Sequence, residues 1–155
     1  MEKGYTVGVD LGGTNIAVAL VDAQGKILAR IGCPTNMPRS AQEIAEDIVR
    51  CVQAMREKAP EPIQWVGVGT PGSVNRETGI VGFANNLDFE NTPLGPMLQR
   101  RVQCPVYLAN DADAAALGEY YAGAGRGCRH MVAVTLGTGI GTGIVLHGQL
   151  YSGAH

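Results

Sequence analysis

Two stretches of this 155-residue chain repeat a single design. Residues 8–22 (GVDLGGTNIAVALVD) and residues 133–148 (AVTLGTGIGTGIVLHG) each combine an apolar strand, Leu-Gly, a turn of Gly and Thr, and a returning apolar strand. A strand–turn–strand unit that recurs after about 125 residues predicts two domains of the same architecture. We therefore expect a first domain at residues 1–122 and the beginning of a second, incomplete domain at residues 123–155.

Strands dominate the first part of the chain and then alternate with helices. Short β-branched runs predict strands at residues 5–10, 16–21, 27–32, 65–70 and 106–109. The first three are joined by short Gly-containing turns and are expected to form an antiparallel meander. Residues 73–91 are mainly polar and turn-forming.

Three helices are expected between and after these strands. Ser40 and Glu43 form a capping box ahead of the first, and Thr92 and Pro93 suit the N-cap and first turn of a short second helix. The third begins after Asn110. A meander followed by crossover connections predicts an α/β fold with a mixed five-stranded sheet and helices on both faces.

Composition and residue spacing argue against several classes of partner. The chain carries 12 Lys and Arg against 14 Asp and Glu and has no basic block, so we expect no nucleic-acid partner. Apolar stretches are interrupted within about ten residues and the start lacks a signal-peptide layout, so we expect a soluble, cytoplasmic protein without a membrane segment. Four cysteines without a CxxC pair and three histidines without metal-ligand spacing predict neither a disulfide framework nor a zinc site.

The first repeat places a carboxylate, bare backbone and a hydroxyl at one turn. Gly12 and Gly13 let a ligand approach main-chain N–H groups, and Thr14 adds a hydroxyl, as in an anion-binding nest. Asp10 suits Mg²⁺, bound directly or through water, because Mg²⁺ prefers few carboxylates together with phosphate oxygens. A plain glycine hairpin with a solvated aspartate explains one such turn equally well. The second turn, at residues 136–143, favours phosphate, because two related nests could grip the β- and γ-phosphates from opposite sides.

A second candidate site follows the last strand before the second repeat. That strand delivers Asn110 and Asp111 to its end, where a helix begins. Asp111 could accept a proton from an attacking hydroxyl while Asn110 holds a neighbouring hydroxyl, as phosphoryl transfer requires. Either residue could instead simply cap the helix, and Asp113 ranks lower because its side chain should point elsewhere. Asn85 and Asn86 carry amides that suit a polyhydroxyl ligand, although loop asparagines are common.

Together these segments resemble the ROK family of sugar kinases and repressors, within the actin-like, ribonuclease-H-like ATPase superfamily. DLGGTNIAVALVD is similar to the family's first phosphate motif and LGTGIGTGIVLHGQLYSGAH to its second. GTPGSV, ANNLDF and LANDADAAALGE are similar to its sugar-side and catalytic segments. The resemblance covers nearly the whole chain, and the order of the motifs makes it specific.

The resemblance implies an actin-like ATPase domain and an ATP-dependent hexose kinase of the glucokinase type, which transfers the γ-phosphate of Mg-ATP to a sugar 6-hydroxyl. It makes Asp111 the catalytic base and Gly72, Asn86 and Asn110 sugar-binding residues. The residues implied for Mg-ATP are Asp10, Gly12, Gly13, Thr14, Gly137, Thr138 and Gly139. His155 occupies the position just before the family's sugar-binding Glu and zinc-ligand cluster, so any zinc ligands are expected outside this chain.

Several points stay open at this stage. Glucose is the favoured sugar among several hexoses, and a homodimer is expected. Because segments that follow His155 in the family are missing here, we expect the 155-residue chain to turn over glucose very slowly or not at all. A sugar-responsive transcriptional regulator needs a DNA-binding region ahead of the first strand, which begins only about five residues from Met1. A non-catalytic sugar-binding or oligomerisation module is the third hypothesis.

Overall fold

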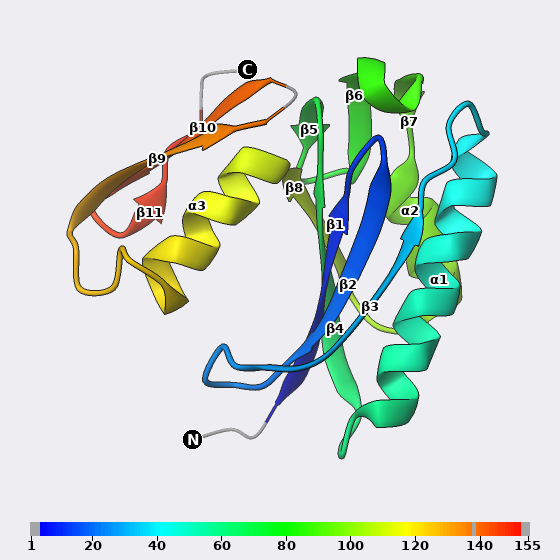
Figure 1. Ribbon diagram of the computed structural model, residues 1–155, viewed down its shortest axis with the longest axis horizontal. Coiled ribbons are helices and arrows are strands. Elements are labelled where there is room, and N and C mark those ends of the chain that lie inside the picture. The colour runs from blue at the N-terminus through cyan, green and yellow to red at the C-terminus, as the bar shows by residue number, and fades with distance from the viewer. Residues whose placement is uncertain (1–3, 138, 153–155) are drawn as a thin grey trace.

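Five strands form the central sheet of the molecule (Figure 1). They are β1 Tyr5–Leu11, β2 Asn15–Val21, β3 Ile27–Pro34, β4 Ile63–Thr70 and β8 Val106–Asn110. In the order β3-β2-β1-β4-β8, β2 is antiparallel to both its neighbours and β4 is parallel to both of its own. This computed structural model describes residues 4–137 and 139–152. The mixed five-stranded sheet predicted from the sequence is confirmed.

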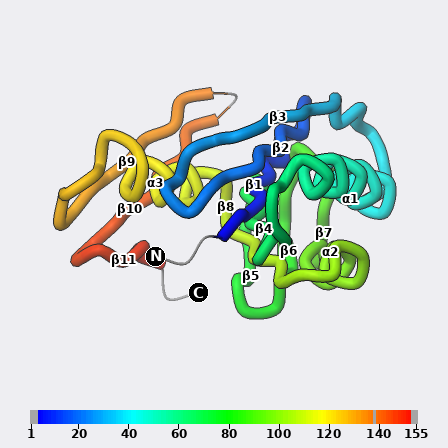
Figure 2. Tube along the Cα trace, turned by 90° about the horizontal axis from the view of Figure 1, so that it is seen from below, coloured from blue at the N-terminus to red at the C-terminus, as the bar shows by residue number. Residues whose placement is uncertain are grey.

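Helices cover both faces of this sheet, as predicted (Figure 2). They are α1 Ala41–Lys58, α2 Leu94–Val102 and α3 Asp111–Ala122. α1 and α2 lie on one face and α3 on the other. Val7, Val9 and Leu11 of β1 point into the core beneath α1, whereas Gly8 and Asp10 alternate to the α3 face. None of the helices in the described part of the chain has the length and apolar character to cross a bilayer.

The predicted helix starts are only partly confirmed. Ser40 caps α1 in a capping box: its Oγ accepts from the Glu43 N–H at 3.3 Å, and the Glu43 carboxylate accepts from the Ser40 N–H at 3.0 Å. At α2 the prediction of a Thr92 cap is wrong, since the N-cap is Pro93 and no side chain caps the helix. Thr92 instead pairs with Val81 in a small sheet, which keeps its backbone extended.

Residues 73–91 contain this small sheet, although only polar turns were predicted there. Its antiparallel strands are β5 Ser73–Asn75, β6 Ile80–Ala84 and β7 Phe89–Thr92, with a 3₁₀ turn η1 Asn85–Leu87 between the last two. Strands of three to five residues are too short for a readable alternation. Val81, Leu87 and Phe89 are buried and join the small sheet to the main core.

The second repeat also folds as a hairpin. Its strands are β9 His130–Leu136 and β10 Ile140–Leu146, followed by β11 Gln149–Leu150, in the order β11-β10-β9. α3 packs against β9 and β10 as well as against β4, so it lies between the two sheets. The strand–turn–strand design predicted for both repeats is confirmed, while a domain boundary at residue 122 remains a prediction.

Candidate functional site

Most of the predicted site residues gather at one edge of the central sheet. The carboxyl ends of β1, β4 and β8 meet there with the β1–β2 turn, η1 and the start of α3 (Figure 1). Asp10 pairs in register with Gly69, and Thr70 pairs with Asn110 on the next strand. Ligands of open α/β sheets bind outside the carboxyl ends of the strands, which makes this edge the candidate site.

The β1–β2 turn packs against η1. The Gly12 N–H donates to the Asn15 carbonyl at 2.9 Å and closes the turn. A β-carbon on Gly13 would lie 3.1 Å from both the β-carbon and the carbonyl oxygen of Asn86, so glycine allows the close approach of the two segments. The fold therefore brings the predicted phosphate turn into contact with a predicted sugar-binding residue.

Asn110 connects the start of α3 to the loop after β4. Its Oδ1 accepts from the N–H groups of Ala112 and Asp113, at 2.9 and 3.3 Å, and its Nδ2 donates to the Gly72 carbonyl at 3.0 Å. Gly72 has a φ of +91°, and a β-carbon there would collide with the Phe83 carbonyl oxygen, so only glycine fits. Asn110 is thus the helix cap, and its amide keeps one N–H for a ligand.

Asp111 is the first residue of α3, and it is exposed at the site edge. Its Oδ1 accepts from the Ala112 N–H at 2.9 Å, and within the described residues its Oδ2 makes no hydrogen bond to protein. Burial raises the pKa of Asp10, and the neighbouring Asp111 carboxylate raises it further. The two carboxylates are therefore close enough to repel each other, and a cation placed beside them would relieve that repulsion.

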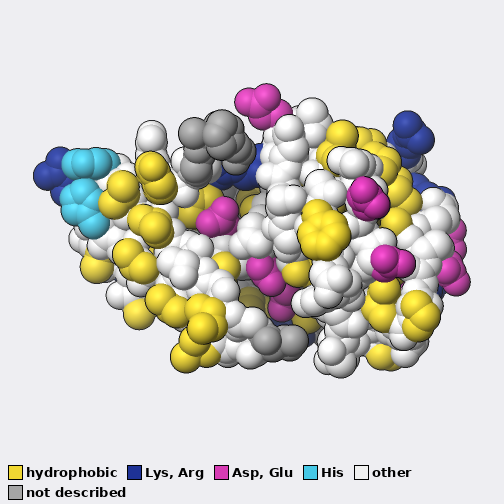
Figure 3. Space-filling view, turned by 90° about the horizontal axis from the view of Figure 1, so that it is seen from above, with side chains coloured by type: hydrophobic (Ala, Val, Ile, Leu, Met, Phe, Trp, Pro, Cys, Tyr) yellow, Lys and Arg dark blue, Asp and Glu magenta, His cyan; other side chains and the backbone are white. Residues whose placement is uncertain are grey.

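Asp113 and Arg76 bring further charge to the same region. Burial raises the pKa of Asp113, the Arg76 guanidinium acts to lower it, and the charge of Asp111 acts to raise it. Figure 3 shows acidic side chains in the hollow between the part of the molecule built on the central sheet and the part built on the β9–β10 hairpin. Arg76 was not predicted as a site residue, because the turn between β5 and β6 that carries it belongs to the small sheet that was not predicted.

The β9–β10 hairpin packs against the start of α3 from the other sheet. Within its turn the Gly137 N–H donates to the Gly139 carbonyl at 2.9 Å, while Thr138 lies outside the described residues. A β-carbon on Gly141 would lie 2.8 Å from the β-carbon of Ala112, so the hairpin packs against the first turn of α3. The start of α3 thus lies between β4 of the central sheet and the hairpin that carries the second glycine turn.

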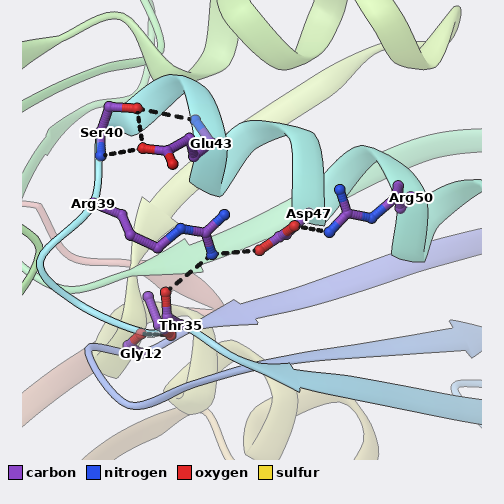
Figure 4. A network of polar contacts seen from close by, with 7 residues as sticks. All are labelled: Gly12, Thr35, Arg39, Ser40, Glu43, Asp47 and Arg50. Carbon is purple, nitrogen blue, oxygen red and sulfur yellow. Dashed lines mark hydrogen bonds and ion pairs between the residues drawn. The ribbon is translucent and has the colours of Figure 1, made fainter.

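A polar network behind the β1–β2 turn was missed by the sequence analysis (Figure 4). Thr35 hydrogen-bonds to that turn, and Arg39 connects Thr35 to Asp47 on α1. One signal was available: Asp47 interrupts the buried apolar stripe of α1, next to Ile44 and Ile48. A carboxylate at such a position needs a charged partner, which predicts an ion pair without saying which arginine supplies it.

The donors of this edge suit a phosphate bound with Mg²⁺. Within the described residues, no three His, Cys, Asp or Glu side chains come together to hold a metal. Mg²⁺ commonly takes one or two carboxylates, several waters and phosphate oxygens, and Asp10 beside the turn can supply such a carboxylate. The residues present therefore fit a metal that arrives with a phosphate ligand.

Comparison with known proteins adds independent findings. The sequence profile of the ROK family matches residues 6–155. Glucokinase of Thermotoga maritima is 44% identical over 154 residues, which are 99% of this chain and 48% of that protein. Xylose repressor of Caldicellulosiruptor bescii is 29% identical over 156 residues, 99% of this chain and 39% of the repressor.

A solved structure extends the similarity to three dimensions. The ROK family glucokinase of Streptomyces griseus, in complex with glucose and AMPPNP, matches with a TM-score of 0.89 and 41% identity. The match covers 97% of this chain and 47% of that one. The chain spans about half the length of the curated glucokinases it matches.

Proposed function

The chain belongs to the ROK family, whose actin-like ATPase fold it shares, and we propose that it provides the catalytic base of an ATP-dependent hexose kinase. One observation carries the proposal: the exposed Asp111 begins α3 between β1, which leads into the first glycine turn, and the hairpin that carries the second, and its charge reaches Asp10. Phosphoryl transfer depends mainly on positioning and on charge stabilisation, and this arrangement offers both. Glucokinase relatives, one of them solved with glucose and AMPPNP, support the choice of substrates.

Asp111 acts as the general base. Its unengaged Oδ2 accepts the proton of the sugar 6-hydroxyl while that oxygen attacks the γ-phosphorus of ATP. The new O–P bond forms as the bond from the γ-phosphorus to the β,γ-bridging oxygen breaks. ADP leaves with the electron pair of that bond, and the proton on Asp111 passes to solvent after the sugar phosphate departs.

The two glycine turns hold the phosphates. Gly12, Gly13 and Thr14 form the first side of this site, and the residues assigned to the second side are Gly137, Thr138 and Gly139. Asp10 would hold Mg²⁺ directly or through water, and the ion would neutralise phosphate charge. This assignment gives a role to a carboxylate with a raised pKa beside a glycine turn.

The sugar lies on the η1 side of the same edge. Asn86, in contact with Gly13, and Asn110, with one spare N–H, offer amides to sugar hydroxyls, and the Gly72 loop offers backbone. Glucose is the proposed hexose. Because Gly13 contacts Asn86, the proposed sugar site and the proposed phosphate site lie on neighbouring segments. In-line transfer requires the two substrates to lie next to each other in this way.

The chain spans about half the length of its glucokinase relatives, so the test uses a chimera that has their full length. Residues 1–155 are joined to the remaining part of Thermotoga maritima glucokinase, and ADP release is coupled to a spectroscopic assay with glucose. Asp111→Asn should lower kcat about 10²- to 10⁴-fold while glucose affinity stays nearly unchanged. Asp113→Asn is the matched control, two residues further along α3, and should keep most of the turnover.

Two outcomes would contradict the kinase proposal. One is undiminished turnover of the Asp111→Asn chimera, which removes the base. The other is a chimera that binds glucose but transfers no phosphate even with Asp111 intact. The isolated 155-residue chain is expected to show little or no turnover in the same assay.

A sugar-responsive regulator is the second candidate, favoured by the similarity to a xylose repressor. Such a protein, or a non-catalytic sugar-binding module, would bind sugar but would not need Mg-ATP. Calorimetric titrations with glucose and with Mg-AMPPNP separate these functions, since the kinase proposal expects binding of both ligands.

A further inference from the structure

Thr35 directly follows β3 and is completely buried. Its hydroxyl donates to the Gly12 carbonyl at 2.6 Å, and its backbone N–H donates to the Thr14 carbonyl at 2.8 Å. Its own carbonyl accepts from Nη1 of Arg39 at 3.2 Å (Figure 4). Every polar group of Thr35 is therefore engaged, and two of the three hold the β1–β2 turn.

The two bonds to the turn fix the direction of its peptide groups. A peptide unit is planar and trans, so its C=O and N–H point in opposite directions. The Gly12 carbonyl shares one unit with the Gly13 N–H, and it is drawn toward Thr35. The Gly13 N–H is consequently aimed away from β3, and within the described residues it donates to no protein acceptor. An N–H held in this way is pre-oriented for an anion.

Arg39 connects Thr35 to Asp47 on α1. Arg39 donates from the same Nη1 to Oδ2 of Asp47 at 2.6 Å, and Arg50 pairs with the other oxygen of that carboxylate. The Asp47 side chain is only 6% exposed, so it is a charge removed from solvent with both oxygens paired. An apolar residue would fill the stripe of α1 at lower desolvation cost. The pairing fixes the distance between α1 and the segment that carries Thr35.

We propose that Thr35 is a positioning residue for phosphate binding, which sets the orientation of the Gly12–Gly13 peptide, and that Arg39 and Asp47 hold Thr35 in place. This inference rests on the proposed function, because it takes the phosphates of Mg-ATP as the ligand of the turn. It adds a role for three residues that do not touch the ligand. In this account the affinity for nucleotide depends on side chains behind the turn.

The experiment compares three variants of the 155-residue chain. Thr35→Val removes the hydroxyl at nearly constant volume, Thr35→Ser keeps it, and Val66→Ala is the control for lost stability. Val66 is equally buried, but it lies near the start of β4, where it pairs with Val7 and Val106, away from the candidate site. Amide hydrogen exchange of the free protein reports on the turn through the Gly12 N–H, which is bonded to Asn15. Calorimetry with Mg-AMPPNP reports on phosphate binding.

Thr35→Val should speed exchange at Gly12 and weaken Mg-AMPPNP binding, each by about tenfold, as expected for one lost hydrogen bond. Thr35→Ser should restore both values to near wild type. Val66→Ala should leave both unchanged, even where it lowers the melting temperature as much as Thr35→Val does. A purely structural role of Thr35 would instead make Thr35→Val and Val66→Ala alike.

The possible failures are distinguishable. Unchanged exchange at Gly12 in Thr35→Val overturns the positioning role, whatever the nucleotide does. Faster exchange with unaltered Mg-AMPPNP affinity also overturns it, because the turn would then not need its orientation for binding. If Thr35→Val shows the exchange effect but the wild-type chain binds no nucleotide, the result contradicts the proposed function and, with it, the assignment of phosphate as the ligand.

Discussion

The β1–β2 and β9–β10 hairpins share a sequence design but differ in what surrounds them. Leu11 and Leu136 occupy the same place in the repeat, yet Leu11 is 0% exposed and Leu136 is 79% exposed. The first hairpin lies inside the five-stranded sheet, with α1 over one face and Thr35 behind its turn. The second packs on α3 through one face only, and its other face is exposed and apolar, as Figure 3 shows.

The difference shows which features follow from the local sequence pattern and which follow from contacts with residues distant in the sequence. Both stretches encode strand, turn and returning strand, and both form them. Contacts with distant residues decide how firmly each turn is held. Thr35 holds the first turn through two hydrogen bonds. In the second turn, a β-carbon added at Gly137 or Gly139 would meet none of the described residues within 4 Å.

The strongest test of this comparison truncates the equivalent leucines. Leu11→Ala should lower the free energy of unfolding by about 2–5 kcal/mol, because it leaves a cavity in the core. Leu136→Ala should change it by no more than about 0.5 kcal/mol, since the side chain is already in solvent. Urea unfolding followed by circular dichroism measures both. Equal losses would show that the two hairpins are enclosed alike.

The turn glycines should respond with opposite signs. Gly13→Ala pushes the turn away from Asn86, and we expect it to cost about 1 kcal/mol of stability. Gly137→Ala meets no neighbour within 4 Å among the described residues, and Gly137 is not one of the glycines with a positive φ. This substitution should stabilise by about 0.4–1 kcal/mol, because alanine has less freedom in the unfolded chain. Thermal unfolding of the two variants provides the comparison. A gain in stability at Gly13 would mean that the turn is not packed on η1.

A smaller effect is expected from Asp10, which stands opposite Thr135 in the repeat. Burial, together with the charge of Asp111, raises the folded-state pKa of Asp10 above its unfolded value. Its proton therefore favours the folded state at low pH, and that stability is lost as pH rises through the folded-state pKa. Asp10→Asn should remove this loss and melt above wild type at pH 7.

The matched control for this pH dependence is Thr135→Val, which removes no titrating group. Its melting temperature should follow the same pH profile as wild type. The raised pKa of Asp113 leaves part of the profile in Asp10→Asn as well, so the predicted result is a shallower slope rather than a flat line. An unaltered slope in Asp10→Asn would show that its carboxylate is fully solvated.

The smallest effect on stability is expected at the exposed face of the second hairpin. Leu136 and Ile140 are 79% and 80% exposed, and they lie opposite each other in register. We expect this face to support the proposed homodimer, because an apolar patch of this kind favours association. Leu136→Lys should leave the melting temperature nearly unchanged and convert a dimer to a monomer in light scattering. Persistence of a dimer would place its interface elsewhere.

The sequence patterns correctly predicted the parts of the fold that depend on residues close together in the sequence. The three antiparallel strands, the Ser40–Glu43 capping box and the Asn110 cap each follow from side chains within a few positions. The β5–β6–β7 sheet was missed because its strands are very short and its anchors, such as Phe89, act through distant core contacts. The Thr92 cap was wrong because pairing with Val81 overrode local preference.

The candidate site divides in the same way. Asp10 and Asp111 were selected from their positions at strand ends, and the parallel β1–β4–β8 order brings those ends together. Thr35 and Arg39 could not be selected, because their significance lies in bonds that span the β3–α1 connection and the first turn. Of these network residues, only Asp47 could be recognised from the sequence, because it is a carboxylate within the apolar stripe of α1.

The most direct test of the central claim maps both ligands on the chain itself. Amide resonances are followed by NMR while Mg-AMPPNP and glucose are added separately and together. The account predicts that Mg-AMPPNP shifts residues 12–15 and that glucose shifts Asn86 and the first turn of α3, around Asp111. Shifts that instead cluster away from this edge, for example in the 460 Å³ groove lined by Arg56, Glu61 and Gln103 at the start of β4, would contradict it.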